Sequence, residues 1–220
     1  VFSSVAPSYD IMNDLMSLGM HRLWKRRFVE TVDLKENEIV LDVGSGSGDI
    51  ASEILKENLQ NSLYLLDLNQ EMLSEGKKRL KNEKNIKYFI GNAEKLNFKS
   101  NFFDKYVISF CLRNVTEYQL SLKEAYRVLK PGGKYCCLEF STPKSSLISS
   151  SYKIYKSKIL PMLGEIVAKD KNAYKYLSES IDLFPSQEEL SKKLIDCGFT
   201  KIKTINLFNG IVAIHTGYKM

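Results

Sequence analysis

Apolar residues recur along the chain with two different periods, and the two periods alternate. Short runs rich in β-branched and aromatic residues indicate buried strands, and between them apolar residues return every three or four positions, as on one helix face. The expected strands are 39–43, 62–66, 86–90, 105–110 and 134–140. The expected helices are 48–59, 70–81 and 117–129. This alternation predicts a parallel sheet that is covered by helices on both faces.

A further helical pattern lies on either side of this core. Residues 12–30 carry an apolar stripe with helical spacing, which Gly19 interrupts softly. Residues 147–167 place a second stripe on one helix face, and Pro161 is expected to force a break in it. Each stripe is compatible with plain core packing and with the lining of an apolar groove.

The end of the chain predicts a change of strand direction. Residues 130–133 combine proline and two glycines, which indicates a helix stop and a tight turn. After a helix at 186–196, strands are expected near 201–207 and 211–218, and Asn209-Gly210 between them is typical of a hairpin. A mostly parallel seven-stranded sheet that ends in an antiparallel hairpin is the layout of the α/β, Rossmann-like class I methyltransferase fold. With no repeat and no linker in view, we expect one domain over residues 1–220.

Composition is ordinary for a folded protein, with 44% hydrophobic and 26% charged residues. The net charge of +6 comes mainly from lysines spread along the chain. We interpret it as a solvated surface, with an anionic membrane or nucleic acid as the alternative partners. One denser basic cluster surrounds Trp24: His21, Arg22, Lys25, Arg26 and Arg27.

Targeting and redox signals are weak. No apolar run approaches the length of about 18–20 residues that crosses a bilayer, and no signal-peptide pattern opens the sequence. Because Val1 is not a methionine, we expect that a segment preceded it. The four cysteines show no metal-ligand spacing, which indicates a reducing compartment and no metal site. They are Cys111, Cys136, Cys137 and Cys197.

A glycine-rich turn follows the first expected strand. Gly44, Gly46 and Gly48 let the backbone approach a ligand closely, and the helix that follows offers free N–H donors. In the dinucleotide-binding version of this turn, the sixth position carries Gly or Ala. Here it is Asp49, which suits the amino group of a methionine moiety better than a pyrophosphate. The turn therefore favours S-adenosylmethionine over NAD.

Polar residues at the ends of the next strands extend this site. Asp67 closes the second strand, where a carboxylate can accept both ribose hydroxyls. Asn92 and Ala93 follow the third strand, where an amide and a backbone N–H could contact the adenine edge. Ser109 ends the fourth strand and faces the same crevice. Each position also has an ordinary interpretation as a loop or turn residue.

Five stretches of the chain resemble the ubiquinone/menaquinone biosynthesis C-methyltransferase family, and together they span nearly its whole length. They are 9–24, 112–116, 127–141, 176–181 and 217–219. The first is the most discriminating, because many methyltransferases share the Arg-Val-Leu-Lys-Pro-Gly-Gly stretch. The resemblance implies cofactor contacts from Ser47, Asp67, Asn92, Ala93 and Ser109. The sequence departs from the family at Gly44-Ser45-Gly46-Ser47, where Ala-Gly-Gly-Thr is usual, and at Cys111, where Gly is common.

The implied reaction methylates a ring carbon of a prenylated quinol. Such a carbon becomes nucleophilic as a neighbouring hydroxyl loses its proton, and a free phenol has a pKa of roughly 10. We predict that Arg113 stabilises the phenolate and that Asn114 positions the second oxygen. The alternative for Arg113 is a structural arginine that pairs with an acid. Asp10, Asp49 and His21 are the candidate proton acceptors, and His21 is equally compatible with a structural role.

The same resemblance sets the remaining expectations. The segments 1–35 and 143–185 should form an acceptor-side lid, and Met12, Met16 and Met20 could line a groove for the prenyl tail. The expected partners are a polyprenyl benzoquinol, or alternatively demethylmenaquinol or another small phenolic, together with an anionic membrane surface or a quinone-biosynthesis complex. A homodimer is one candidate state, and no nucleic acid is expected. The expected location is the matrix side of the mitochondrial inner membrane, or the cytoplasm beside the inner membrane of a bacterium.

Two other classes of protein remain open on the residues alone. One is an NAD-dependent oxidoreductase, which Asp49 opposes. The other is a non-catalytic, basic module that binds RNA or membrane, which is opposed by the cofactor constellation and by the lack of aromatic residues interleaved with lysine and arginine. Binding of labelled S-adenosylmethionine, compared with NAD and RNA, separates the three.

Overall fold

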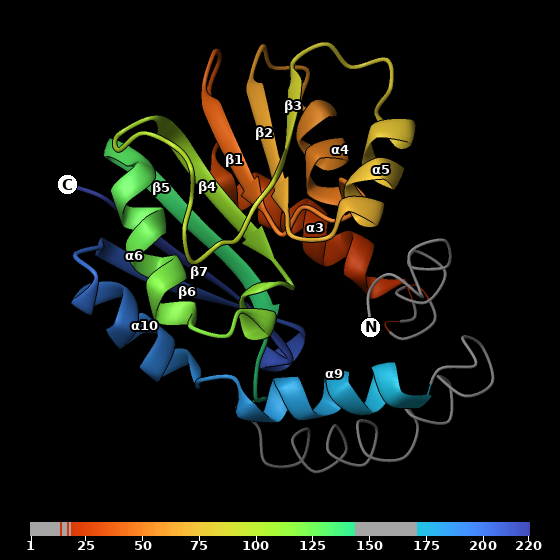
Figure 1. The fold of residues 1–220 in the computed structure, drawn as a ribbon. Coiled ribbons are helices and arrows are strands. Elements are labelled where there is room, and N and C mark those ends of the chain that lie inside the picture. Colours follow the sequence, from red (N-terminus) through yellow and green to blue (C-terminus); the bar gives the residue numbers. More distant parts are fainter. Residues whose placement is uncertain (1–13, 15–16, 18, 144–170) are drawn as a thin grey trace.

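The computed structural model describes residues 14, 17, 19–143 and 171–220. Seven strands form one sheet in the order β3-β2-β1-β4-β5-β7-β6 (Figure 1). The first five strands are parallel, and β7 runs antiparallel to both β5 and β6. The expected mostly parallel sheet with an antiparallel C-terminal hairpin is confirmed. The strands are β1 Ile39–Val43, β2 Ser62–Asp67, β3 Ile86–Ile90, β4 Phe103–Ser109, β5 Leu129–Phe140, β6 Thr200–Leu207 and β7 Val212–Tyr218.

Helices cover both faces of the sheet, and one helix crosses its carboxyl edge (Figure 1). Two short 3-10 turns, η2 and η4, complete the described elements. The helices and turns are α3 Met20–Val32, α4 Asp49–Leu55, α5 Gln70–Arg79, η2 Leu112–Asn114, α6 Tyr118–Val128, α9 Lys171–Leu183, α10 Gln187–Asp196 and η4 Phe208–Gly210.

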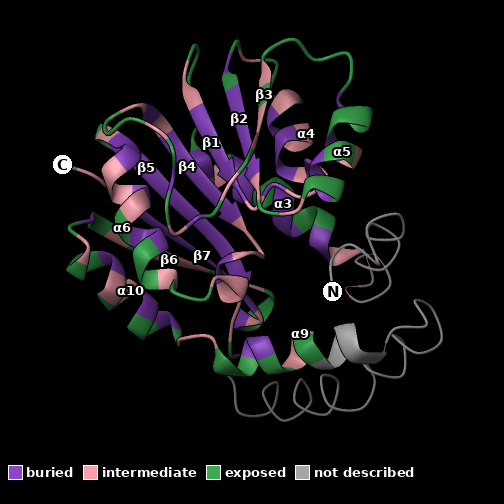
Figure 2. Ribbon diagram, in the orientation of Figure 1, coloured by how far each residue is buried: buried purple, intermediate pink, exposed green. Residues whose placement is uncertain are grey.

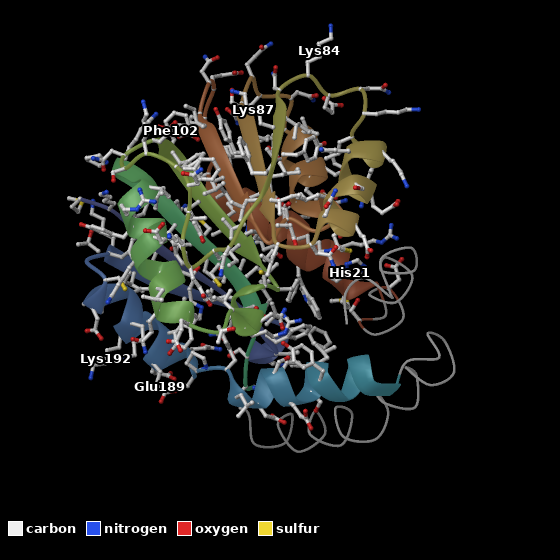
Figure 3. The ribbon with its side chains drawn as sticks, viewed as in Figure 1. His21, Lys84, Lys87, Phe102, Glu189 and Lys192 are labelled. Carbon is white, nitrogen blue, oxygen red and sulfur yellow. The ribbon has the colours of Figure 1, made fainter. Side chains whose placement is uncertain are left out.

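The alternation of side chains along the strands divides the core into two layers. On β1, Leu41 and Val43 belong to the layer beneath α6 and α10, whereas Val40 belongs to the layer beneath α3, α4 and α5. Successive strand residues point to opposite faces, so strands that are covered on both sides are apolar almost throughout. Figure 2 shows the central strands buried and the outer helix faces exposed. Charged side chains such as Lys84, Glu189 and Lys192 extend outward from the surface (Figure 3).

Several element boundaries differ from the sequence-based expectation. α4 ends at Leu55, four residues early, because the chain turns at Asn58 with a φ of +56°. β5 begins at Leu129 rather than at residue 134, and the expected turn at 130–133 is an irregularity within that strand. Gly132 has a φ of +82°, which lets the strand continue through residues 130–133 as an irregular segment.

Two expectations about the flanking segments also change. Gly19 takes a φ of +76° and begins α3 as its N-cap rather than bending a longer helix. The helix α9 at Lys171–Leu183 was not expected from the residue pattern. The expected helix at 147–167, and most of the expected lid segments, lie outside the described residues. The hairpin is confirmed, with Asn209 and Gly210 at positive φ between β6 and β7.

Candidate active site

A cleft of about 840 Å³ opens at the carboxyl ends of β1, β2, β3 and β4. This edge is where open α/β sheets bind their ligands. Seven of the expected site residues line it: Gly44, Gly46, Asp67, Asn92, Ala93, Ser109 and Asn114. Three expected site residues do not line the cleft that the described residues form: Ser47, Asp49 and Arg113.

The glycine-rich turn passes close beneath the cleft. The N–H groups of Gly44 and Ser45 both donate to the carbonyl of Leu66, at 2.7 and 3.1 Å. Gly44 has a φ of +66°, and a Cβ atom built there would lie 2.1 Å from Sγ of Cys111. Only glycine fits this position, because both the backbone conformation and the contact with Cys111 exclude a side chain.

Asp67 is fixed by the backbone on both of its oxygens. Oδ2 accepts from the N–H of Gly46 at 2.8 Å, and Oδ1 accepts from the N–H of Asn69 at 2.8 Å. Burial raises the pKa of Asp67, and these N–H groups oppose that rise. A carboxylate oxygen can accept more than one hydrogen bond, so Asp67 can also grip a pair of hydroxyls presented from the cleft.

Three further positions show how far the residues fit S-adenosylmethionine. The hydroxyls of Ser47 and Ser109 are buried and have no hydrogen-bond partner among the described residues. Unpaired buried hydroxyls are costly, so a ligand that supplies partners would relieve them. The Asn92 side chain is already engaged, since its Oδ1 accepts from the N–H of Glu94 at 2.9 Å. The cradle fits the cofactor, and the Asn92 amide, although bonded to Glu94, keeps a second lone pair and a second N–H with which to contact a base.

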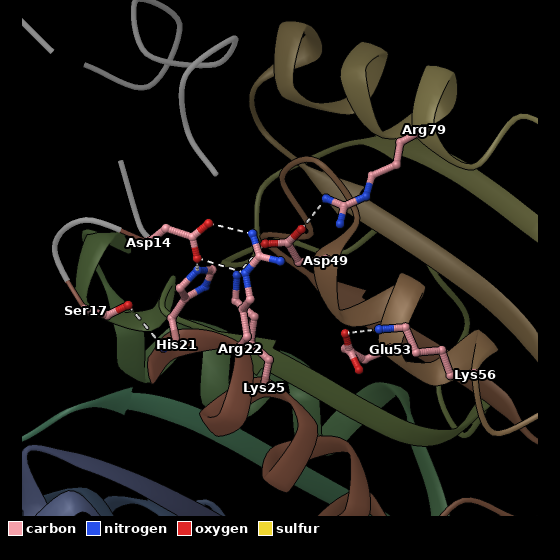
Figure 4. A network of polar contacts seen from close by, with 9 residues as sticks. All are labelled: Asp14, Ser17, His21, Arg22, Lys25, Asp49, Glu53, Lys56 and Arg79. Carbon is pink, nitrogen blue, oxygen red and sulfur yellow. Dashed lines mark hydrogen bonds and ion pairs between the residues drawn. The ribbon is translucent and has the colours of Figure 1, made fainter. Parts of the chain in front are cut away.

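Asp49 is turned toward two protein cations, which the sequence did not suggest. Its carboxylate pairs with Lys25 of α3 and with Arg79 of α5 (Figure 4). Burial alone would raise the pKa of Asp49, but Lys25 and Arg79 outweigh it and hold that pKa below its ordinary value. Contact of Asp49 with a methionine amino group stays a prediction, and its charge is no longer a strong argument against a pyrophosphate.

The basic cluster of α3 is largely neutralised within the protein. His21 and Lys25 are buried, and Arg22 and Arg27 pair with Asp14 and Glu30. Nε2 of His21 lies 2.8 Å from Oδ1 of Asp14. Four of the five basic side chains in this cluster are thus buried or paired with an acid, and Arg26 is exposed.

Neither of the two described candidates for the proton acceptor, His21 and Asp49, lies on the wall of the cleft. Burial and the charge of Lys25 lower the pKa of His21, against the opposing effect of Asp14. His21 pairs with Asp14, and Asp49 pairs with Lys25 and Arg79 (Figure 4). Asp10 lies outside the described residues. The identity of the proton acceptor stays open.

Arg113 forms a buried ion pair. Its Nη1 donates to Oε1 of Glu139 at 2.8 Å and to the carbonyl of Phe110 at 2.5 Å. The side chains of Arg113 and Glu139 are 7% and 2% exposed. This is the arrangement expected of the structural alternative, an arginine paired with an acid, and the catalytic assignment stays a prediction.

Asn114 reaches the cleft and contacts the helix that crosses above it. The hydroxyl of Tyr176, on α9, donates to Oδ1 of Asn114 at 3.2 Å. This bond fixes the carboxamide so that its NH₂ group remains available as a donor. A hydrogen-bond donor at the cleft wall would suit an oxygen atom of the methyl acceptor, and this role of Asn114 stays a prediction.

The structure adds wall residues that the sequence analysis did not select. Leu68 and Met72 supply apolar surface next to Asp67, and Phe110 and Cys111 do so next to Ser109. Leu68 and Phe110 each follow directly after a selected polar residue, which was the available signal. Burial raises the pKa of Cys111 to about 12, so its thiol is neutral and packs against the glycine turn.

The described ranges contain neither a cluster of metal ligands nor a helix that could span a membrane. No three His, Cys, Asp or Glu side chains there gather into a set that could hold a metal ion. Among those same residues, no helix combines the length and the apolar character needed to cross a membrane.

Comparison with known proteins places the chain among methyltransferases. Residues 1–219 match the profile of the ubiE/COQ5 methyltransferase family. The chain is 50% identical to the ubiquinone/menaquinone biosynthesis C-methyltransferase UbiE of Rickettsia bellii, covering 100% of this chain and 91% of that protein. It is 48% identical to the protein of the same name from Rickettsia prowazekii, with the same coverage.

Solved structures share the fold at low sequence identity. A SAM-dependent methyltransferase from Aquifex aeolicus superposes with a TM-score of 0.69 at 18% identity, covering 96% of this chain and 98% of that one. A phosphoethanolamine N-methyltransferase from Haemonchus contortus, in complex with S-adenosyl-L-methionine, gives 0.68 at 18% identity, covering 89% and 52%. These likenesses confirm the expected fold.

Proposed function

The chain belongs to the ubiE/COQ5 methyltransferase family, and from that premise we propose that it transfers the methyl group of S-adenosylmethionine to a ring carbon of a prenylated benzoquinol. The observation that carries the proposal is the cleft itself, where a glycine cradle, a backbone-fixed carboxylate and the unpaired, buried hydroxyl of Ser109 meet at the carboxyl edge of the sheet. The names of the relatives cover both ubiquinone and menaquinone biosynthesis, so demethylmenaquinol is the second candidate acceptor.

The residues around the cleft divide into two groups. Gly44 and Gly46 would admit the cofactor close to the backbone, Asp67 would hold its ribose hydroxyls, and Ser109 would bond near its reactive end. When bound, S-adenosylmethionine supplies an electrophilic methyl group on a sulfonium. Asn114 would serve the acceptor, since its NH₂ group would donate to a ring oxygen as negative charge develops there.

The reaction needs orientation and the removal of two protons. The ring carbon donates its electron pair to the methyl carbon while the carbon–sulfur bond breaks toward sulfur, and the ring carbon then loses its hydrogen as a proton. The hydroxyl proton leaves before or during the attack, and the ring oxygen regains a proton when the ring becomes aromatic again, so one proton is released overall. The apolar side chains of Leu68, Met72 and Phe110 would reduce the water around the reacting groups once both ligands are bound, which favours a step in which opposite charges cancel.

Contact with a membrane is part of the proposal, because a prenyl tail partitions into lipid. Two large apolar side chains at the carboxyl edge of the sheet support it, since Leu183 is 86% exposed and Phe208 is 59% exposed. The location would be the inner membrane, on the matrix side in a mitochondrion or the cytoplasmic side in a bacterium. Association with a quinone-biosynthesis complex and homodimerisation stay predictions.

The test uses the purified chain, methyl-labelled S-adenosylmethionine, and short-tailed benzoquinol and naphthoquinol acceptors kept reduced. The expected result is label on a ring carbon, identified by mass spectrometry, with the benzoquinol preferred. Folded protein that binds the cofactor but labels neither quinol would refute the acceptor class. Saturable micromolar binding of NAD in parallel would instead support the oxidoreductase alternative.

A further inference from the structure

Phe110 has a backbone conformation that bulky residues rarely adopt. Its φ angle is +51°, in the left-handed region that favours glycine. Non-glycine residues keep such a conformation only where their surroundings hold them in it, and they cluster at functional sites. Phe110 follows β4 directly and lines the cleft.

The groups that hold Phe110 come from β5 and η2. Its N–H donates to the carbonyl of Leu138 at 2.8 Å. Its carbonyl accepts from Nη1 of Arg113 at 2.5 Å, and the same nitrogen donates to Glu139 at 2.8 Å. Glu139 also accepts from the N–H of Phe140 at 2.9 Å, which fixes the carboxylate in turn.

The aromatic surroundings of Phe110 extend this arrangement. Its ring centroid lies 4.8 Å from that of Phe140 and 6.3 Å from that of Trp24. The guanidinium of Arg113 lies 5.3 Å from the centroid of Phe140, so the ion pair and the aromatic cluster are in contact. A single cluster therefore connects the buried ion pair to the wall of the cleft.

We propose that Arg113 and Glu139 are positioning residues, which clamp the backbone of Phe110 so that its ring forms the wall that orients the planar acceptor. The nature of the acceptor rests on the proposed function. Aromatic rings prefer offset-stacked or edge-to-face contacts, which would fix the tilt of the acceptor, and small errors in the line of attack are costly.

The charge balance separates this proposal from direct catalysis by Arg113. A guanidinium that stabilises a phenolate must present its charge to the acceptor, yet here Glu139 neutralises it at 2.8 Å. Burial raises the pKa of Glu139, and the charge of Arg113 opposes that rise. If Arg113 acted directly, removal of the Glu139 charge would leave its positive charge less compensated, and Arg113 would stabilise the phenolate more strongly. If it acts through Phe110, the same change would loosen the clamp.

Glu139→Gln therefore has opposite expected outcomes under the two roles. With the clamp, turnover falls about tenfold, as for the loss of one charged hydrogen bond, the KM for the quinol rises, and cofactor affinity stays within twofold. Unchanged or faster turnover in folded protein would overturn the proposal. Glu124→Gln is the matched control, because Glu124 also pairs with an arginine, Arg127, at 2.7 Å but lies on the outer helix α6.

A second readout does not need the acceptor. Trp24 is the single tryptophan of the chain and packs beside Phe110. Loosening of the clamp by Glu139→Gln is expected to shift its emission to longer wavelength, whereas Glu124→Gln leaves it unchanged. An unaltered spectrum in the Glu139 variant would count against the clamp even if no quinol were methylated, so the two proposals can fail separately.

A glycine at the strained position provides the sharpest test. Glycine adopts a positive φ without strain, so the Phe110→Gly background should remove most of the need for the clamp. Glu139→Gln should then change turnover by less than twofold in that background, although both variants are slow. A full tenfold effect there would show that Glu139 acts by another route and would overturn the proposal. If Glu139→Gln does not fold, Arg113→Lys takes its place in the same cycle. One nitrogen of Arg113, Nη1, bonds to both the Phe110 carbonyl and Glu139, and the shorter lysine side chain would not place its nitrogen at that point.

Discussion

Replacement of Asp67 by alanine tests the cofactor site most directly. The carboxylate is held by the N–H groups of Gly46 and Asn69, both at 2.8 Å, so it is already oriented before a ligand binds. Loss of two charge-assisted hydrogen bonds to ribose should weaken binding of S-adenosylmethionine by ~1.5–3 kcal/mol. At 1.36 kcal/mol for each factor of ten, this is about a 10- to 150-fold increase in Kd.

Titration calorimetry can separate that loss from damage to the glycine turn. Asp67→Asn keeps an oxygen for only one of the two backbone N–H groups, so it should bind the cofactor weakly and melt between the wild type and Asp67→Ala. A cofactor analogue without the ribose 2′-hydroxyl provides the cross-check: it should bind worse to the wild type but no worse to Asp67→Ala. An affinity within twofold of the wild type in a folded variant would remove Asp67 from the site.

Three further predictions follow from single contacts. Burial lowers the pKa of His215 from 6.5 to about 4. The free energy of unfolding should therefore fall by about 3 kcal/mol as the pH falls from 6.5 to 4, because the unfolded chain binds the proton first. Denaturant unfolding measured against pH should show this fall in the wild type and a smaller one in His215→Gln. Tyr176→Phe should lower turnover severalfold, and a double-mutant cycle with Asn114→Ala should remove that effect, whereas additive losses would show that Tyr176 does not act through Asn114. Gly44→Ala should abolish cofactor binding because its Cβ would lie 2.1 Å from Sγ of Cys111, and Cys111→Gly should restore binding only in part because the φ of +66° remains unfavourable.

The sequence predicted the fold well because its signals are local and agree with one another. The β3 run 86–90 and the hairpin at Asn209-Gly210 appear as expected, since strand length and turn chemistry are set by neighbouring residues. α9 was missed although its own residues place apolar side chains at helical spacing, so the local signal for this helix was present in the sequence. The strand β5 extends through Pro131 because an irregular pairing with β4 can accommodate a residue without an N–H.

The candidate site was predictable where a residue acts through its position at a strand end. Asp67 and Ser109 line the cleft for that reason, and the topology alone brings them together. Where a role depends on a distant partner, the sequence was silent. Asp49 is paired with Lys25, 24 residues away, and Arg113 with Glu139, 26 residues away. Nothing in either local pattern identifies these partners, so their charges could not be balanced in advance.

The pairing of Asp49 joins three separate segments at one carboxylate: α3 through Lys25, the glycine turn, and α5 through Arg79. Such a junction makes the docking of α3 and the ordering of the turn thermodynamically linked, and linkage is reciprocal. A ligand that orders the turn strengthens the attachment of α3. The attachment of α3 strengthens the binding of that ligand by the same factor. We therefore expect α3 to contribute to cofactor affinity from a distance. Its removal, or reversal of the Lys25 charge, would raise the Kd for the cofactor while leaving every described residue of the cleft wall in place.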